Sequence, residues 1–328
     1  MLRWSLFLAM AVGIACFAAL LVANGFGDIM RGVATVGWGL VLIIGIRFIS
    51  LSLAGLAWGT VLGGFVQRPA GLYIGLRIVR EAINCLLPAA QVGGDLIGGR
   101  LLAQFGVPAG LAGASILVDI LLQTVTQGLF AVTGLAALWL VFGDGPVVRE
   151  VGASLLIAVP ALGGFFMVQR LGAFALVDRG LVAMRRFCPG MLPDRPIDIQ
   201  PALRRLYTDR TALGQAAIIH FVGWLAGTIE IWLALGRMGV KPSATEALVL
   251  ESLGQAVRSA AFAVPGALGI QEGGFILLGS MFGLGASTAV ALSLIKRIPD
   301  FAIGVPGLLG WQALEAVRLR PSAEPADR

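Results

Sequence analysis

The stretch that decides the expected fold is RSAAFAVPGALGIQEGGFILLGSMFG, residues 258–283. It is apolar enough to lie in a lipid bilayer, yet Pro265, Gly266 and Gly269 interrupt it, and an acid, Glu272, follows the interruption. A helix broken at membrane depth frees backbone polar groups that lipid does not satisfy, so it is tolerated only where protein or a water-filled cavity covers them. We therefore expect a broken segment beside a polar cavity.

The same pattern occurs earlier in the chain. In NCLLPAAQVGGDLIGGRLLAQFG, residues 84–106, Pro88 and Asp95 are placed as Pro265 and Glu272 are in the later stretch. The same 177 positions separate both pairs (265 − 88 and 272 − 95). This recurrence predicts an internal repeat. Broken helices in repeated halves are typical of transporters that bind their substrate near the membrane midplane.

The composition defines the class of protein. The chain is 58% hydrophobic and 13% charged, with a mean hydropathy of +0.90, whereas soluble domains carry about 25% charged residues. Its long apolar runs predict a polytopic α-helical membrane protein, and they lack the alternation of an outer-membrane barrel. One histidine, His220, and three scattered cysteines form no metal-binding or nucleophile motif. We expect no catalytic residue, no metal and no other cofactor.

Apolar runs and polar connectors divide the chain into five parts. These are an N-terminal transmembrane helix (1–30), a first repeat (31–142) with its broken segment (84–106), a fourth helix and basic cytoplasmic loop (143–207), a second repeat (208–319) with its broken segment (258–283), and a disordered tail (320–328). The apolar spans are expected at about 2–23, 33–57, 108–142, 150–169, 211–236 and 286–316.

The expected fold is all-α, with about six transmembrane helices and two re-entrant broken-helix hairpins. If six helices cross the membrane and both broken segments return to the side they entered from, the basic connectors all lie on one side. Because basic connectors face the cytoplasm, this topology predicts a protein of the inner membrane with both termini in the cytoplasm. The first helix of the first repeat then runs toward the cytoplasm, and the first helix of the second repeat runs away from it. The two halves are therefore expected to be an inverted repeat.

Charged side chains within the apolar spans indicate where the function lies. Each costs roughly 2.5–3.5 kcal/mol at the bilayer centre on insertion scales, so such residues face a cavity or a partner. Half-helices beginning at Gly94 and Gly269 would offer unpaired N–H groups to a phosphate. The candidate residues for lipid-headgroup binding and transport are Asn84, Asp95, Arg100, Asp119, Arg258, Gln271, Glu272, Lys296, Arg297 and Asp300.

Some pairings are predicted from spacing. Lys296 and Asp300 are four residues apart and would pair on one helix face. Asp119 and Lys296 are 177 residues apart (296 − 119) and would meet where the two halves join.

Single residues keep alternative roles. Asp95 and Glu272 would bind substrate, carry protons or only cap their own half-helices. Arg47 would line a pathway or reach from a helix end to the membrane surface. His220 is more typical of a packed histidine than of a proton relay.

Several of these motifs resemble a known family. The matching segments are NCLLPAAQVGGD (84–95), the region of Asp119, RSAAFAVPGALGIQEGG (258–274), LIKRIPD (294–300) and GLLGWQALE (307–315). They are similar to the lysylphosphatidylglycerol synthase transmembrane-region family (flippase-like, UPF0104-type), with closest similarity to its hopanoid-biosynthesis-associated HpnL branch. The resemblance implies a domain whose broken helices host or translocate a lipid. The soluble aminoacyltransferase domain of the synthases is not expected here, so we expect no enzymatic activity.

The function expected is a flippase-like protein that binds and translocates a lipid through a cavity between inverted repeats. A hopanoid or another polar or isoprenoid lipid is the expected substrate. Expected partners are membrane lipids and lipid-biosynthesis membrane proteins, and nucleic acid is not expected because the basic loops suit anionic lipid. Two alternatives stay open, a membrane-embedded lipid-modifying enzyme and a non-catalytic partner of a lipid-biosynthesis complex. The missing nucleophile–base pair argues against the enzyme.

Overall fold

A computed structural model gives the structure of residues 14–87, 93–146, 148–150, 152–153, 167, 199–261 and 264–319. These residues form helices and connections, with no strand among them, which confirms the all-α expectation for this part of the chain. The helices are Ile14–Ala23, α2 (Phe26–Val36), α3 (Gly39–Leu62), α4 (Ala70–Leu86), α5 (Gly93–Gln104), α6 (Ala109–Phe142), α9 (Gln200–Leu206), α10 (Arg210–Arg237), α11 (Ala244–Ala260), the 3₁₀ turn η1 (Pro265–Ala267), α12 (Ile270–Met281) and α13 (Ala286–Leu319).

Three of the described helices, α3, α6 and α10, are long and apolar enough to cross a membrane. A fourth span results if the helix Ile14–Ala23 and α2, which meet at a bend of 91°, are counted as one. α13 is not among them because Lys296, Arg297 and Asp300 lie close together in its middle. Most of the spans expected at 2–23 and 150–169, the basic loop, Pro88 and the tail lie outside the described residues.

The second expected span needs correction. It was expected at 33–57, but the long helix α3 begins only at Gly39, and the residues before it form the separate helix α2. Glycines cause both boundaries, because Gly25 has φ +76° before α2 and Gly37 has φ +51° after it. Other residues rarely adopt such positive φ values, so the chain turns at both glycines.

The helices of the two halves match in length. α4 and α11 share their bounds at an offset of 174 residues (244 − 70 and 260 − 86). α5 matches α12 and α6 matches α13 at an offset of 177 (270 − 93 and 286 − 109). The second break, Ala261–Gly269, is therefore three residues longer than the first, 87–92. The prediction of one constant offset holds for α5, α6 and their counterparts, and it is wrong for α4.

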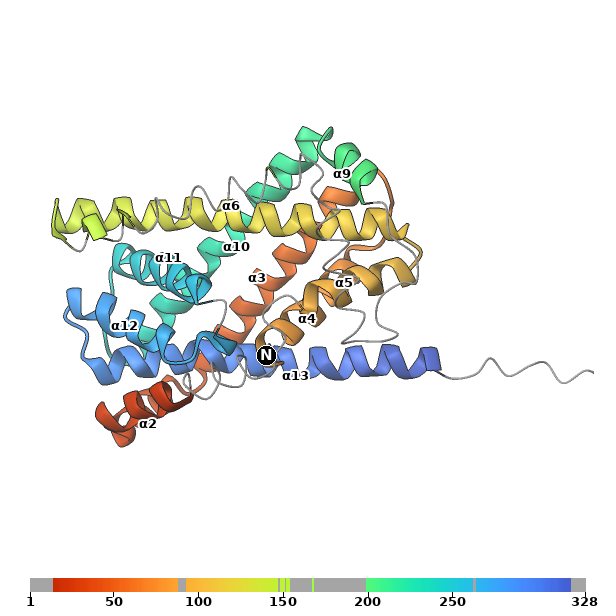
Figure 1. The fold of residues 1–328 in the computed structure, drawn as a ribbon. Helices are drawn as coiled ribbons and strands as arrows, with labels where there is room; N and C mark the ends of the chain where they lie inside the picture. Colours follow the sequence, from red (N-terminus) through yellow and green to blue (C-terminus); the bar gives the residue numbers. More distant parts are fainter. Residues whose placement is uncertain are drawn as a thin grey trace, which may run out of the picture.

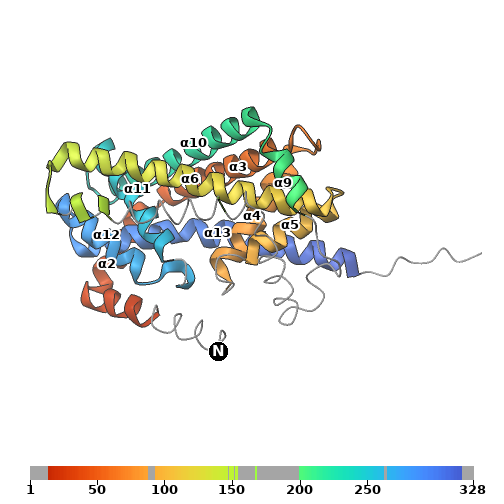
Figure 2. The same cartoon turned by 45° about the horizontal axis from the view of Figure 1, so that its top comes forward.

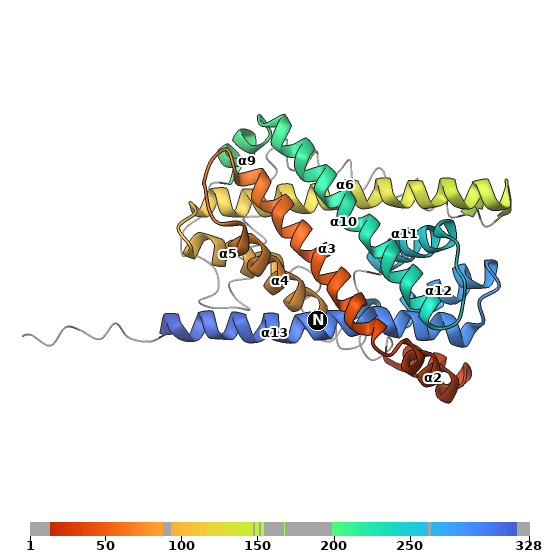
Figure 3. The ribbon, with the colours of Figure 1, turned by 180° about the vertical axis from the view of Figure 1, so that it is seen from behind.

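Matching helices run in opposite directions (Figure 1). α6 and α13 lie along opposite sides of the bundle and are antiparallel. α3 and α10, also antiparallel, pack against each other and cross in front of α6 and α13 in the view of Figure 3. α4 and α5 form a hairpin near one end of the bundle, and α11 and α12 form one near the other end (Figures 1 and 2). The end of α4 and the end of α11, where the two hairpins turn, both lie toward the middle of the bundle (Figures 1 and 2).

Each hairpin packs against its own hydrophobic cluster. Trp58 and Leu62 of α3 lie with Leu101 and Leu102 of α5 in the first cluster. The second cluster surrounds α11 and α12. Close packing in the first depends on Gly55, where an added Cβ would lie 2.7 Å from the Cα of Ile74 on α4. Apolar packing thus holds each hairpin in place, and the polar side chains gather between the two.

Candidate functional site

A polar cavity of about 270 Å³ lies between the two hairpins. Its wall is formed by α3, α4, α6, α10 and α11, with Asp95 of α5 and Gly266 of the second break. Charged side chains are rare at membrane depth, so their concentration around one cavity makes it the candidate functional site. The charged residues that line it are Arg47, Arg77, Arg80, Glu81, Asp95 and Arg258.

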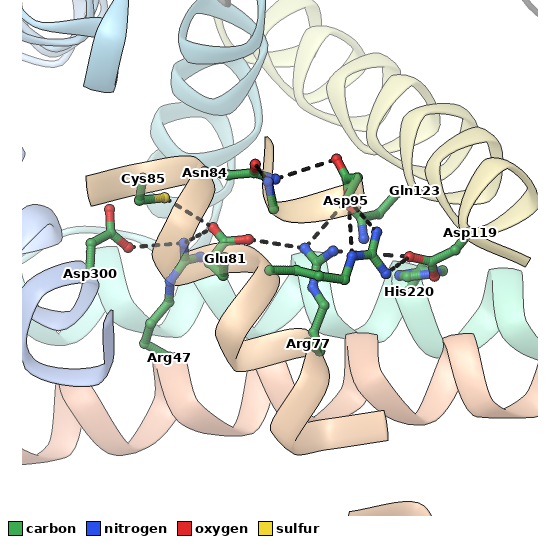
Figure 4. A network of polar contacts seen from close by, with 12 residues as sticks. Arg47, Arg77, Glu81, Asn84, Cys85, Asp95, Asp119, Gln123, His220 and Asp300 are labelled. Atoms are coloured by element: carbon green, nitrogen blue, oxygen red, sulfur yellow. Dashed lines mark hydrogen bonds and ion pairs between the residues drawn. The ribbon is translucent and has the colours of Figure 1, made fainter. Parts of the chain in front are cut away.

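Ion pairs run along one side of the cavity as a continuous chain (Figure 4). Arg258 on α11 donates to Asp300 on α13 across 2.9 Å, and Arg47 on α3 donates to the other oxygen of Asp300 across 3.0 Å. Arg47 also lies 3.3 Å from Glu81, which accepts from Arg77 at 3.1 Å. Arg47 therefore lines the cavity, and the alternative that it reaches to the membrane surface is wrong.

The chain of ion pairs continues to the first hairpin (Figure 4). Arg80 is fully buried and binds Asp95 at 2.6 Å and Asp119 at 2.7 Å. Arg77 approaches Asp119 at 4.0 Å, and the Nε2 of His220 lies 3.0 Å from the free oxygen of Asp119. His220 is thus buried against a carboxylate at the cavity wall. Four arginines and four carboxylates alternate along this chain of ion pairs, so their charges balance.

The start of α5 is held by side chains of the same hairpin. Asn84 accepts a hydrogen bond from the backbone N–H of Gly94 at 2.7 Å, and its own amide lies 3.4 Å from Asp95. An added Cβ at Gly94 would lie 2.0 Å from the carbonyl oxygen of Arg80, so only glycine fits here. The expectation that the Gly94 N–H is unpaired is therefore wrong, because Asn84 occupies it.

The second hairpin holds its acid in a different way. Glu272 is fully buried and accepts from the Gly269 N–H at 2.7 Å, from Ser293 at 2.8 Å and from the guanidinium of Arg297 at 2.8 Å. It caps its own helix, so the expected free N–H at Gly269 is also engaged. Arg297 in turn donates to the carbonyl of Gly266 at 2.7 Å. Glu272 and Arg297 brace the second break and do not line the polar cavity.

Three other predicted residues lie outside the polar cavity. Gln271 is buried and donates to Ser293 at 2.9 Å. Arg100 forms an ion pair with Glu315 on α13. Lys296 is buried between Glu251 at 2.6 Å and Glu230 at 3.2 Å.

Both pairings predicted from spacing are therefore wrong. Lys296 pairs with carboxylates of α10 and α11 instead of with Asp300, which pairs with Arg47 and Arg258. Asp119 and Lys296 belong to two separate clusters. Of the predicted site residues, Asn84, Asp95 and Arg258 line the cavity, and Asp119 and Asp300 bind arginines that line it.

Sequence reasoning left important residues out of the site. Arg77 lies three and four residues before Arg80 and Glu81, and Asn84 lies four and three residues after them, which places all four on one face of a helix. That signal was available and would have found the wall of the cavity. Glu230 and Glu251 carry no comparable signal, because their common partner Lys296 comes from a third helix. The residues left out of the candidate list are Arg77, Arg80, Glu81, Glu230 and Glu251, whereas Arg47 and His220 were considered only as alternatives.

An apolar pocket adjoins the polar cavity. It measures about 560 Å³ and is lined mainly by apolar side chains of the helix Ile14–Ala23, α2, the end of α4 and α13. Cys85, Arg258 and Gly266 belong to the walls of both spaces. The Arg258–Asp300 ion pair thus lies at the boundary between a charged compartment and an apolar one.

Long apolar helices packed around a buried, ion-paired cavity define a polytopic α-helical membrane protein. The chain belongs to the family of the lysylphosphatidylglycerol synthase TM region, whose model matches residues 6–307. It is 23% identical over 306 residues to a UPF0104 membrane protein of Methanothermobacter thermautotrophicus, which covers 87% of this chain and 86% of that protein. No solved structure matches the chain. The expected family is confirmed, and the hopanoid-associated branch stays a prediction.

Proposed function

We propose that this protein binds a lipid and carries its polar head across the inner membrane through the cavity between its two halves. The observation that carries the proposal is the shared wall of the polar cavity and the apolar pocket at Arg258 and Cys85. A lipid needs both environments side by side, a polar one for its head and an apolar one for its tails. In this arrangement the tails stay in the apolar pocket or the bilayer while the head enters the cavity.

The transmembrane arrangement is part of the proposal. Six crossing helices and two re-entrant hairpins, with both termini in the cytoplasm, would place the turns of the two hairpins near the midplane from opposite sides. The equal lengths and opposite directions of the matching helices support this inverted arrangement. Inverted halves give a protein two states of similar energy, each open to one side, which is the basis of alternating access.

The chemistry of head-group binding follows from the ion pairs. Arg258 and Arg47 both bind Asp300, so the two cations are held apart from each other and aimed at the cavity without a ligand present. A polar or anionic head would exchange one carboxylate contact for its own oxygen, and an arginine makes such exchanges at little geometric cost because it has five donors. The arginines of the cavity wall therefore keep an oxygen partner both before and after the head group enters.

The substrate class and the cellular partners also belong to this proposal. The similarity of segments 84–95 and 258–274 to the hopanoid-associated branch supports a hopanoid or another polar or isoprenoid lipid as the substrate. The same similarity supports an association with membrane proteins of lipid biosynthesis and a transport role without enzymatic activity.

Lipid exchange in vesicles tests the proposal. Purified protein is reconstituted into vesicles of phosphatidylethanolamine and phosphatidylglycerol with a head-labelled phospholipid, and in parallel with a labelled polyol or isoprenoid-phosphate lipid. We expect exchange across the bilayer well above that of protein-free vesicles for at least one of these lipids. Arg258→Gln should slow it by about tenfold or more, since a hydrogen bond to a charged group contributes about 1.5–3 kcal/mol.

The matched control is Arg237→Gln, which changes an exposed arginine at the end of α10 and should leave exchange unchanged. Exchange no faster than in protein-free vesicles for every lipid class would contradict the proposal. Equal rates for Arg258→Gln and Arg237→Gln would show that the shared wall is not the path of the head group.

A further inference from the structure

A second buried charge cluster lies behind the cavity and is not used by the proposed head-group site. Glu230 on α10, Glu251 on α11 and Lys296 on α13 are 2%, 2% and 6% exposed. The ammonium of Lys296 lies 2.6 Å from Glu251 and 3.2 Å from Glu230. Two carboxylates therefore share one cation away from water.

Among the described side chains, the other cations on the helices packed against α10 are each bound to a carboxylate outside the cluster. Of the helices packed against α10, α3 contributes Arg47, which is already bound to Glu81 and Asp300. The charged residue of α6 is Asp119, bound to Arg80 and His220, and the charges of α2 form the exposed pair Asp28–Arg31. α11 contributes Arg258 and α13 contributes Arg297, which bind Asp300 and Glu272.

The charges of the cavity wall and the cluster can be counted together over the described residues. Five cations, Arg47, Arg77, Arg80, Arg258 and Lys296, face six carboxylates, Glu81, Asp95, Asp119, Asp300, Glu230 and Glu251. With His220 neutral, one negative charge is left over. An uncompensated buried charge costs several kcal/mol, and a protein removes that cost by binding a proton.

The hydrogen bonds indicate where this proton binds. Both oxygens of Glu251 are engaged, one by Lys296 and the other by the amide of Gln255 at 2.9 Å. In Glu230, one oxygen contacts Lys296, whereas Oε1 is buried and has no hydrogen-bond partner among the described residues. A protonated carboxyl group can leave one oxygen without a donor at much lower cost than a carboxylate.

We propose that Glu230 is the binding site of one exchangeable proton that is linked to the lipid cavity. Gln255 lines the cavity and contacts Glu251, so the cluster begins directly behind the cavity wall. A proton from cavity water binds Glu251, Lys296 passes one of its own protons to Glu230, and Glu251 returns its proton to Lys296. The net step moves one proton from water to Glu230 and leaves Lys296 charged.

A proton site at Glu230 would couple lipid transport to pH. This coupling, unlike the proton site itself, rests on the proposed function. An anionic head adds one negative charge to the network, and this added charge makes proton binding at Glu230 more favourable. Because linkage is reciprocal, head-group binding favours proton uptake, and proton uptake favours head-group binding. Exchange of an anionic lipid should therefore increase as the pH falls through the titration of Glu230.

Infrared spectroscopy tests the proton site without requiring transport. Purified protein in bilayer discs of phosphatidylethanolamine and phosphatidylglycerol is titrated with acid while the carbonyl stretch of protonated carboxyl groups is recorded. We expect a band from a buried carboxyl group that is absent in Glu230→Gln and shifted in Glu230→Asp. The control Asp144→Asn removes an exposed carboxylate of the α6 end and should leave the band unchanged.

The outcomes separate the site from the transport. A buried carboxyl band that persists unchanged in Glu230→Gln would overturn the proton site. So would a wild-type spectrum that lacks such a band both in sodium buffer and in choline buffer, where sodium ions cannot compete with the proton. Should Glu230→Gln fail to fold, the shift in Glu230→Asp decides. In the vesicle assay, pH-dependent exchange that persists in Glu230→Gln would overturn the coupling. Vesicles without any exchange would contradict the proposed function and leave the infrared result to decide the site.

Discussion

The two hairpins have the same helix lengths and opposite side-chain chemistry. In the first, the fully buried Arg80 on α4 packs over Gly98 on α5, where an added Cβ would lie 2.4 Å from its Cγ. At the matching positions of the second, an added Cβ at Gly254 on α11 would lie 3.2 Å from the ring of Phe275 on α12. Small and large residues have changed places across the same helix contact. The first hairpin therefore holds a charge at its core and the second an aromatic ring.

The signs of the buried charges are also reversed between the halves. Arg77 and Asp119 face each other on α4 and α6, and the matching positions on α11 and α13 hold Glu251 and Lys296. The first pair lies at the wall of the polar cavity, whereas the second pair is buried behind it. One repeated scaffold thus supplies part of the cavity surface in one copy and a closed charge cluster in the other, because side chains can diverge while helix lengths are kept.

The largest effect that separates the two hairpins is expected from Arg80→Met. It removes the cation between Asp95 and Asp119 and leaves both carboxylates without their partner, a change that costs about 3–5 kcal/mol for a buried ion pair. We expect a large loss of thermal stability in detergent, measured by the temperature at which the protein aggregates. The control Arg31→Met breaks an exposed pair with Asp28 and should change stability by less than about 1 kcal/mol. Similar losses for both variants would show that the charged core does not hold the first hairpin.

A medium effect is expected where the first hairpin needs glycine. Gly98→Ala places a methyl group against the Arg80 stem, which its ion pairs prevent from moving, and overpacking of this kind costs about 1–3 kcal/mol. The adjacent change Gly99→Ala meets Ile116 at an ordinary 3.4 Å and should gain up to about 1 kcal/mol from helix propensity. Denaturant unfolding followed by circular dichroism measures both. A destabilisation by Gly99→Ala equal to that of Gly98→Ala would contradict the close contact with Arg80.

The sequence predicted the scaffold better than the contacts. The break and the acid at 265 and 272 were visible because a Pro–Gly interruption and a charge are rare in apolar segments. The partners of the charges were not, since they depend on how separate helices face each other. A constant offset of 177 paired Asp119 with Lys296. That alignment is kept, but the two residues do not meet, because the three extra residues of the second break place Glu251 opposite Lys296 as Arg77 is placed opposite Asp119. Each half therefore has its own ion pair.

The smallest effect on stability, and the sharpest test of inversion, is expected from single cysteines in the connections that precede the two hairpins. The connection between α3 and α4 and the connection between α10 and α11 lie at opposite ends of the bundle (Figures 1 and 3). Gln67 belongs to the first connection and Lys241 to the second, and both residues are exposed. In a background without Cys16, Cys85 and Cys188, Gln67→Cys and Lys241→Cys should each change stability by less than about 0.5 kcal/mol, as surface substitutions do.

A membrane-impermeant maleimide applied to intact cells should label Lys241→Cys and reach Gln67→Cys only after the cells are opened. A third variant, Asp144→Cys at the end of α6, should be labelled like Lys241→Cys, because α6 ends on the side where α10 ends (Figure 1). Labelling of Gln67→Cys and Lys241→Cys from the same side would mean that the two hairpins enter the membrane from one face. The halves would then be parallel copies, and the difference between their cores would reflect two depths of one pathway instead of two sides of one cavity.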